Sequence, residues 1–104
     1  MSLNKNEIIK RLSANLPELT KEYGVRRIGL FGSYATDSFT EESDIDLVVE
    51  FSTPIGFKFF DLITHLENLL GKKIDLLTFE GVKNIRQKEI SSSIERNAIY
   101  VEAA

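Results

Sequence analysis

The chain has 104 residues, of which 42% are hydrophobic and 28% are charged, and its formal net charge is −3. This length and composition predict a single globular domain over residues 1–104 with a hydrophobic core of its own. No stretch is basic enough for a nucleic-acid-binding face, and the absence of cysteine, of an apolar leader and of any apolar run near the roughly 20 residues of a membrane span indicates a cytoplasmic protein.

Residues 3–24 have the periodicity of a helix. Apolar side chains recur at helical spacing as far as Leu19, and Gly24 stands where helices commonly end in a glycine. Pro17 lies inside this pattern and predicts a kink or a break near Leu16, because proline lacks an amide hydrogen and its ring collides with the preceding turn.

The rest of the chain alternates between short β-type runs and helical patterns. The run 45–51 (IDLVVEF) is nearly all apolar and is the strongest strand candidate. Such alternation predicts an α/β (α+β) fold, with a small mixed sheet packed against helices. In chain order the predicted elements are strand 25–31, strand 45–51, helix 56–70, strand 74–79, helix 81–97 and edge strand 98–101.

Two aspartates stand at the head of the strongest strand. Side chains alternate along a strand, so Asp44 and Asp46 are predicted to point to the same face. Adjacent carboxylates repel each other where water is scarce, and a divalent cation removes that repulsion. Asp75 lies between Ile74 and Leu76 in the next predicted strand, where a hydrophobic residue is usual. If the two strands are neighbours, the three carboxylates converge and bind one or two hard cations such as Mg²⁺ or Mn²⁺.

Gly32 and Ser33 directly follow the first predicted strand. A glycine there lets the backbone approach a ligand closely, and the amides and hydroxyl of a short helix starting at Ser33 would face an anion. Together with the carboxylates, these residues predict a site for a nucleoside triphosphate and a divalent metal. The chemistry of such a site is attack of an acceptor hydroxyl on the α-phosphorus, with pyrophosphate as the leaving group.

The same residues admit simpler interpretations. Ser43 and Asp46 have the spacing of a helix capping box, although the residues that follow are β-rich. A Gly-Ser pair after a strand is usually only a turn, and Asp75 would equally suit a turn cap. His65 is predicted to lie on a helix surface, and the aromatic residues at 57–60 are predicted to serve the core and a partner-facing surface.

The segments 32–35 (GSYA) and 43–47 (SDIDL) resemble the signature of the minimal nucleotidyltransferases (MNT) of the polymerase-β-like superfamily. The strand that carries Asp75 matches the place of that family's third carboxylate, and the resemblance covers nearly the whole chain. It implies a nucleotidyltransferase fold, ATP as the donor, and Mg²⁺ as the metal. The implied ligands are Asp44, Asp46 and Asp75 for the metal, with the same three as catalytic residues, and Gly32 and Ser33 for the nucleotide.

The resemblance also implies a partner. Members of this family pair with a HEPN-domain toxin and act as its antitoxin by transferring AMP to one of its tyrosines, so a hetero-oligomer is expected, with no direct contact to nucleic acid or membrane. The family usually has Arg-Gly where this chain has Thr36-Asp37. One alternative is therefore a catalytically weak antitoxin that acts by binding alone. A second alternative is a small-molecule nucleotidyltransferase, which the short chain disfavours because no second domain encloses a small substrate.

Overall fold

The computed structural model describes residues 3–83 and 98–102, which build a four-stranded mixed sheet in the order β3-β2-β1-β4. Strand β1 is antiparallel to both of its neighbours, and β2 is parallel to β3. The elements are α1 (Lys5–Tyr23), β1 (Val25–Phe31), the short 3₁₀ helix η1 (Gly32–Tyr34), β2 (Ile45–Phe51), α2 (Lys58–Leu70), β3 (Ile74–Thr78), α3 (Phe79–Lys83) and β4 (Ile99–Glu102). The predicted α/β (α+β) class is confirmed.

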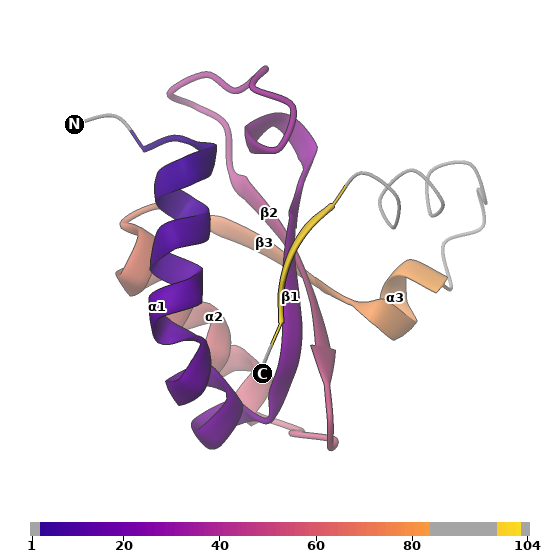
Figure 1. The fold of residues 1–104 in the computed structure, drawn as a ribbon. Coiled ribbons are helices and arrows are strands. Elements are labelled where there is room, and N and C mark those ends of the chain that lie inside the picture. Colours follow the sequence, from indigo (N-terminus) through magenta and orange to yellow (C-terminus); the bar gives the residue numbers. More distant parts are fainter. Residues whose placement is uncertain (1–2, 84–97, 103–104) are drawn as a thin grey trace.

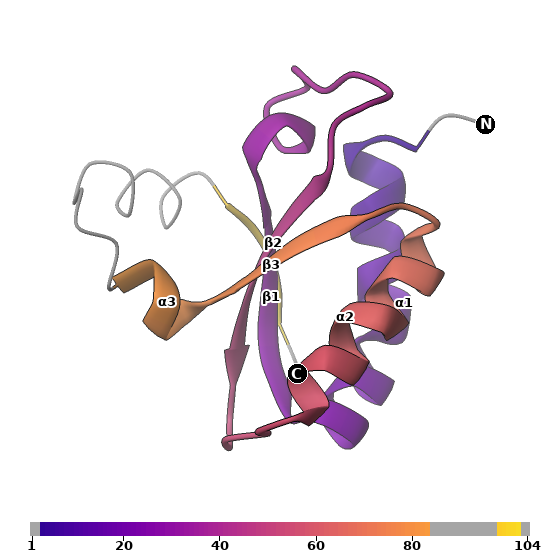
Figure 2. The same ribbon diagram turned by 180° about the vertical axis from the view of Figure 1, so that it is seen from behind.

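The helices divide between the two faces of the sheet. Helices α1 and α2 lie together on one face, and α3 lies on the other side (Figures 1 and 2). Two parallel strands need a connection that crosses one face of the sheet, and such a crossover is right-handed. Helix α2 is this connection between β2 and β3. The face opposite α1 and α2 is the one that carries the predicted carboxylates.

Helix α1 is one uninterrupted helix, so of the kink or break predicted near Leu16 the break is wrong (Figure 1). Pro17 and Ser13, four residues earlier, are both exposed. The hydrogen bond that proline removes therefore belongs to the water-facing side, where the Ser13 carbonyl can bond to solvent instead. The helix starts at an Asn4 cap, whose side chain accepts from the Glu7 amide at 2.9 Å, and ends at Gly24 with φ of 69°.

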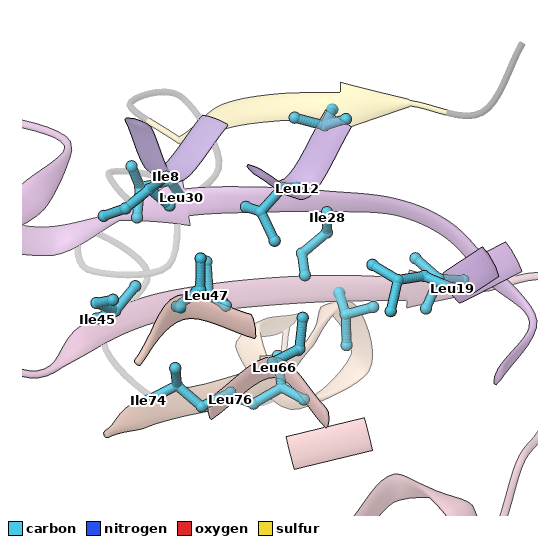
Figure 3. Close-up of a cluster of buried hydrophobic side chains, with 14 of the residues drawn as sticks. Ile8, Leu12, Leu19, Ile28, Leu30, Ile45, Leu47, Leu66, Ile74 and Leu76 are labelled. Carbon is cyan, nitrogen blue, oxygen red and sulfur yellow. The ribbon is translucent and has the colours of Figure 1, made fainter. Parts of the chain in front are cut away.

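The hydrophobic core lies between this pair of helices and the sheet. Its side chains come from the inward stripes of α1 and α2 and from alternate positions of β1, β2 and β3 (Figure 3). Burying each such side chain contributes about 1.5–3 kcal/mol, so alternation fixes which face each strand turns inward. The fully buried residues include Ile8, Leu12, Leu19, Ile28, Leu30, Ile45, Leu47 and Leu66.

On the face of the sheet opposite α1 and α2, several side chains pack around Arg27. Its guanidinium carbon lies 4.3 Å from the ring centre of Phe79 and 4.7 Å from that of Tyr100, and the two ring centres are 5.9 Å apart, so the cation lies over both of two neighbouring rings. The same group pairs with Glu50 and Glu102, each at 3.5 Å. These contacts join the first residue of α3 and strand β4 to the middle of the sheet.

The remaining predicted elements mostly match the structure. Strands 25–31 and 45–51 are confirmed with the predicted bounds, and β4 is confirmed as an edge strand paired with β1. Helix α3 begins two residues before the predicted helix 81–97, whose positions 84–97 lie outside the described residues. Across residues 3–83 and 98–102, no helix is both long and apolar enough to cross a membrane.

Candidate functional site

The site is built on the register of three adjacent strands. Asp46 of β2 stands opposite Phe31 of β1 on one side and opposite Asp75 of β3 on the other. The two aspartate-bearing strands are therefore neighbours, which was the condition for their carboxylates to come together. Asp46 is half-buried and Asp75 is exposed, while the residues before and after each of them are buried. Alternation thus turns both carboxylates toward the face opposite α1 and α2.

Gly32 touches the Asp46 carboxylate directly. It follows the last residue of β1, has φ of 73°, and a Cβ built on it would overlap the Oδ2 atom of Asp46. Glycine is required here twice over, because the backbone is left-handed and because a side chain would displace the carboxylate. The sequence predicted a glycine for close approach to a ligand, but it held no sign that the nearest neighbour is Asp46, fourteen positions later.

The three aspartates share one electrostatic environment. Burial raises the pKa of Asp46, and the charges of Asp75 and then Asp44 raise it further. Asp44 lies one residue before β2 and is exposed, as is Asp75. Among the described residues, no group of three acidic or histidine side chains lies close enough together to hold a metal ion. The carboxylates are therefore within electrostatic reach of one another without being drawn together, as mutual repulsion predicts.

The loop after η1 folds back on Gly32 and Ser33. The Ala35 and Thr36 amides donate to Gly32 O at 3.1 and 3.2 Å, and the Ser38 amide donates to Ser33 O at 2.9 Å. The Thr36 hydroxyl lies 3.3 Å from Gly32 O and 3.4 Å from Ser33 O. The two backbone carbonyls at the start of η1 are thus held by the loop that follows.

Asp37 takes a conformation that favours glycine. Its φ is 59°, the one positive φ among the described non-glycine residues, and aspartate tolerates this region better than most residues do. Its carboxylate pairs with Lys5 of α1 at 3.5 Å. Further along the loop, Phe39 stacks on buried Tyr34 with ring centres 4.2 Å apart. The Lys72 ammonium donates to the Glu41 carbonyl at 2.6 Å.

The simpler interpretations of Ser43 and Asp75 are wrong, and that of His65 holds. Ser43 does not cap a helix, because β2 follows it and its hydroxyl accepts from the Thr40 amide at 2.9 Å. Asp75 lies inside β3 and not in a turn. His65 lies on α2 with its ring packed against Tyr23, as predicted for a helix-surface residue.

Two hollows formed by the described residues lie away from the three aspartates. One of about 440 Å³ is lined by the ends of β2 and β3, with Arg26, Glu50 and Phe79 among its residues. Another of about 280 Å³ lies between the start of α1 and the end of α2 and includes Arg11 and Lys72. Neither is lined by Gly32, Ser33 or any of the three aspartates.

Comparison with known proteins places this chain in one family. The family model described as a nucleotidyltransferase domain matches residues 6–101, so the chain belongs to the nucleotidyltransferase family and is an enzyme of that class. It is 38% identical over 100 residues to the protein adenylyltransferase MntA of Thermococcus cleftensis, covering 95% of this chain and 97% of the relative.

Two solved structures have the same fold. One is described as a "putative minimal nucleotidyltransferase", with a TM-score of 0.74 and 28% identity over 93% of this chain and 95% of the other. The second is a toxin–antitoxin crystal structure with AMP-PNP, with a TM-score of 0.53 and 25% identity over 91% of this chain and 84% of the other. The resemblance to minimal nucleotidyltransferases, drawn from two short motifs, is thus confirmed.

Proposed function

We propose that this chain transfers AMP from ATP to a hydroxyl group of a partner protein, with Mg²⁺ or Mn²⁺ held by Asp44, Asp46 and Asp75. The observation that carries the proposal is the strand register that puts Asp46 beside Asp75 and under the α-carbon of Gly32. A glycine turn beside two carboxylates on neighbouring strands suits a ligand that has both phosphate oxygens and a metal.

The residues present fit a hard divalent cation. The donors are carboxylate oxygens, which Mg²⁺ and Mn²⁺ prefer. Burial and the neighbouring carboxylates raise the pKa of Asp46, so its charged form is destabilised in the folded chain. A bound cation would remove this destabilisation. When bound, the cation would offset the charge of the phosphates and stabilise the charge that develops during transfer.

The other residues of the site have separate roles in this proposal. Gly32 and Ser33 hold the phosphate chain, because the absence of a side chain at Gly32 lets the backbone amides approach it. Asp75 is exposed on an edge strand, where an acceptor can reach it. We assign it to the acceptor hydroxyl, which it orients and whose proton it accepts.

The acceptor in this proposal belongs to a second protein. Asp44 and Asp75 are exposed, which lets an acceptor carried on another protein reach them. A relative is named a protein adenylyltransferase, and a structural neighbour is a toxin–antitoxin complex. We infer that this chain is an antitoxin whose target is a tyrosine of a HEPN-domain toxin. AMP there would add negative charge where such a toxin binds RNA phosphates.

The test is transfer of AMP to the purified partner. The partner, ATP and Mg²⁺ are incubated with the chain, and the intact mass of the partner is measured. We expect a gain of one or more AMP units on tyrosine with the wild-type chain, and none with Asp44→Asn or Asp46→Asn. Asp61→Asn is the matched control, because Asp61 is an exposed carboxylate on α2.

A different outcome separates the two antitoxin mechanisms. If the partner is inhibited with its mass unchanged, and Asp44→Asn still protects cells, the chain acts by binding alone. The exposed rings of Phe57 and Phe60, 88% and 65% exposed, would then be the first surface to alter.

A further inference from the structure

The ammonium group of Lys72 lies where three segments around the proposed site meet. We propose that Lys72 is a positioning residue, which fixes the carboxylate of Asp44 relative to that of Asp75 by tying the turn before Asp44 to the start of β3. The role of the two aspartates in binding metal rests on the function proposed above, whereas the tie between the two segments is a property of the chain itself.

Asp44 lies outside the sheet, so its position depends on the residues on either side of it. It precedes β2 by one residue and is exposed. On the side that follows it, the Ile45 amide donates to the Lys73 carbonyl at 3.1 Å, which attaches the chain to the segment that enters β3. On the side that precedes it, the position of Asp44 depends on the turn formed by residues 40–43.

This turn is closed by its own hydrogen bonds. The Thr40 amide donates to the Ser43 hydroxyl at 2.9 Å, and the Ser43 amide donates to the Thr40 carbonyl at 3.1 Å. These bonds make residues 40–43 one unit, but both of them lie within the turn. A contact from another part of the chain is therefore needed to hold the turn against the sheet.

Lys72 supplies this contact. Its half-buried side chain donates to the Glu41 carbonyl at 2.6 Å, and in the part of the chain that the structure describes no other loop or side-chain hydrogen bond reaches that carbonyl. A charged donor makes a stronger bond than a neutral one. The same ammonium lies 5.6 Å from the ring centre of buried Tyr34, the last residue of η1. One cation thus links the turn, η1 and the entry to β3.

Both sides of Asp44 are therefore held by the same short segment. Lys72 holds the turn before it, and the Lys73 carbonyl holds the residue after it. This segment continues directly into β3, where Asp75 is the third residue after Lys72. A divalent cation needs its ligand oxygens at set distances, and residues that orient the ligands contribute to its affinity. Loss of the Lys72 ammonium should therefore weaken metal binding.

The first test uses Mn²⁺ alone, and the direction of the effect decides it. Lys72→Met removes the ammonium and keeps the length of the side chain, Lys72→Arg keeps the charge, and Lys10→Met alters an exposed lysine of α1 as the control. Free Mn²⁺ is measured by electron paramagnetic resonance. We expect Lys72→Met to bind Mn²⁺ about fivefold more weakly, the size of one hydrogen bond, with Lys72→Arg and Lys10→Met close to wild type. Removing a positive charge would by itself tighten binding of a cation. Unchanged or tighter binding in Lys72→Met would overturn the proposal.

The second test needs no metal. The ¹⁵N heteronuclear Overhauser effect reports the mobility of each backbone amide on the picosecond-to-nanosecond timescale. We expect its values for residues 40–44 to fall in Lys72→Met and to stay at those of wild type in Lys72→Arg and Lys10→Met. Wild-type values in Lys72→Met would show that the turn is held without Lys72 and would reject the proposal. A fall in Lys72→Met, in a chain whose wild type binds no Mn²⁺, would uphold the tie and reject the metal site of the proposed function.

Discussion

Asp46 and Gly32 both occupy positions in the proposed site that lower the stability of the fold. Asp46 is half-buried next to Asp75, and Gly32 lies so close to it that no side chain fits between them. A neutral or apolar residue at position 46 would avoid both burial of a charge and repulsion between carboxylates. The pattern is typical of residues kept for binding or catalysis rather than for stability.

The pH dependence of stability should reveal this cost. The pKa of Asp46 is raised by burial and by its acidic neighbours, so the folded chain disfavours the charged form. A group with a raised pKa stabilises the fold below its ordinary pKa, and that contribution is lost as the pH rises through the folded pKa. Without metal, Asp46→Asn should therefore be more stable than wild type at pH 7, and the difference should shrink toward about pH 4.

Urea unfolding in EDTA at several pH values between 4 and 7 measures this difference. Asp61→Asn, which alters an exposed carboxylate of α2, is the control and should show no such trend. A less stable Asp46→Asn at pH 7 would mean that the Asp46 charge supports the fold instead.

At the scale of elements, Arg27 adds side-chain contacts that link α3 and β4 to the centre of the sheet. Its guanidinium lies over the rings of Phe79 and Tyr100 and pairs with Glu50 and Glu102. Its Nε atom is buried and lacks a hydrogen-bond partner among the described residues, so the aromatic rings and charges hold it in place of a directed bond. The side chain acts as a clamp between elements that are far apart in the sequence.

Neighbouring arginines give a matched test of this clamp. Arg27→Met keeps the length of the side chain and removes its charge, and we expect it to lower the free energy of unfolding by about 1–2 kcal/mol. Arg26→Met removes an ion pair to the same Glu50 from a side chain that is 71% exposed, and should cost less than about 0.5 kcal/mol. Denaturant unfolding measures both. Equal losses in the two variants would show that the rings contribute nothing.

For the whole molecule, nucleotide and metal should act as one ligand. The carboxylates repel a triphosphate until a cation lies between them, so ATP with Mg²⁺ should raise the melting temperature clearly and ATP with EDTA should not. A ligand at 100 times its Kd stabilises a fold by about 2.7 kcal/mol, which in a domain of this size corresponds to roughly 10 °C or more.

Thermal unfolding with each combination of ATP, Mg²⁺ and EDTA tests this coupling. The double variant Asp44→Asn with Asp46→Asn should lose the shift while it remains folded. An equal shift in EDTA would show that ATP binds without the carboxylates.

Local patterns in the sequence determined the elements and the faces they present. Period-two alternation around Asp46 and Asp75 predicted strands with acids on one face, and this survives folding because the neighbouring residues are buried whatever the partners. The prediction failed at Pro17, where α1 continues because the position faces water. A proline inside a helical pattern looks the same in the sequence whether it faces water or the core, and only the packing distinguishes these two cases.

Tertiary structure alone decided which of these residues meet. The register that sets Asp46 opposite Asp75, the contact between Gly32 and Asp46, and the reach of Lys72 back to Glu41 depend on how strands pair and loops close. Such contacts join residues that are far apart in the sequence, so no periodic pattern of the sequence predicts them. Composition and spacing supplied the chemistry of this protein, and the pairing of its strands turned that chemistry into a site, because side chains cooperate only where the backbone brings them within reach.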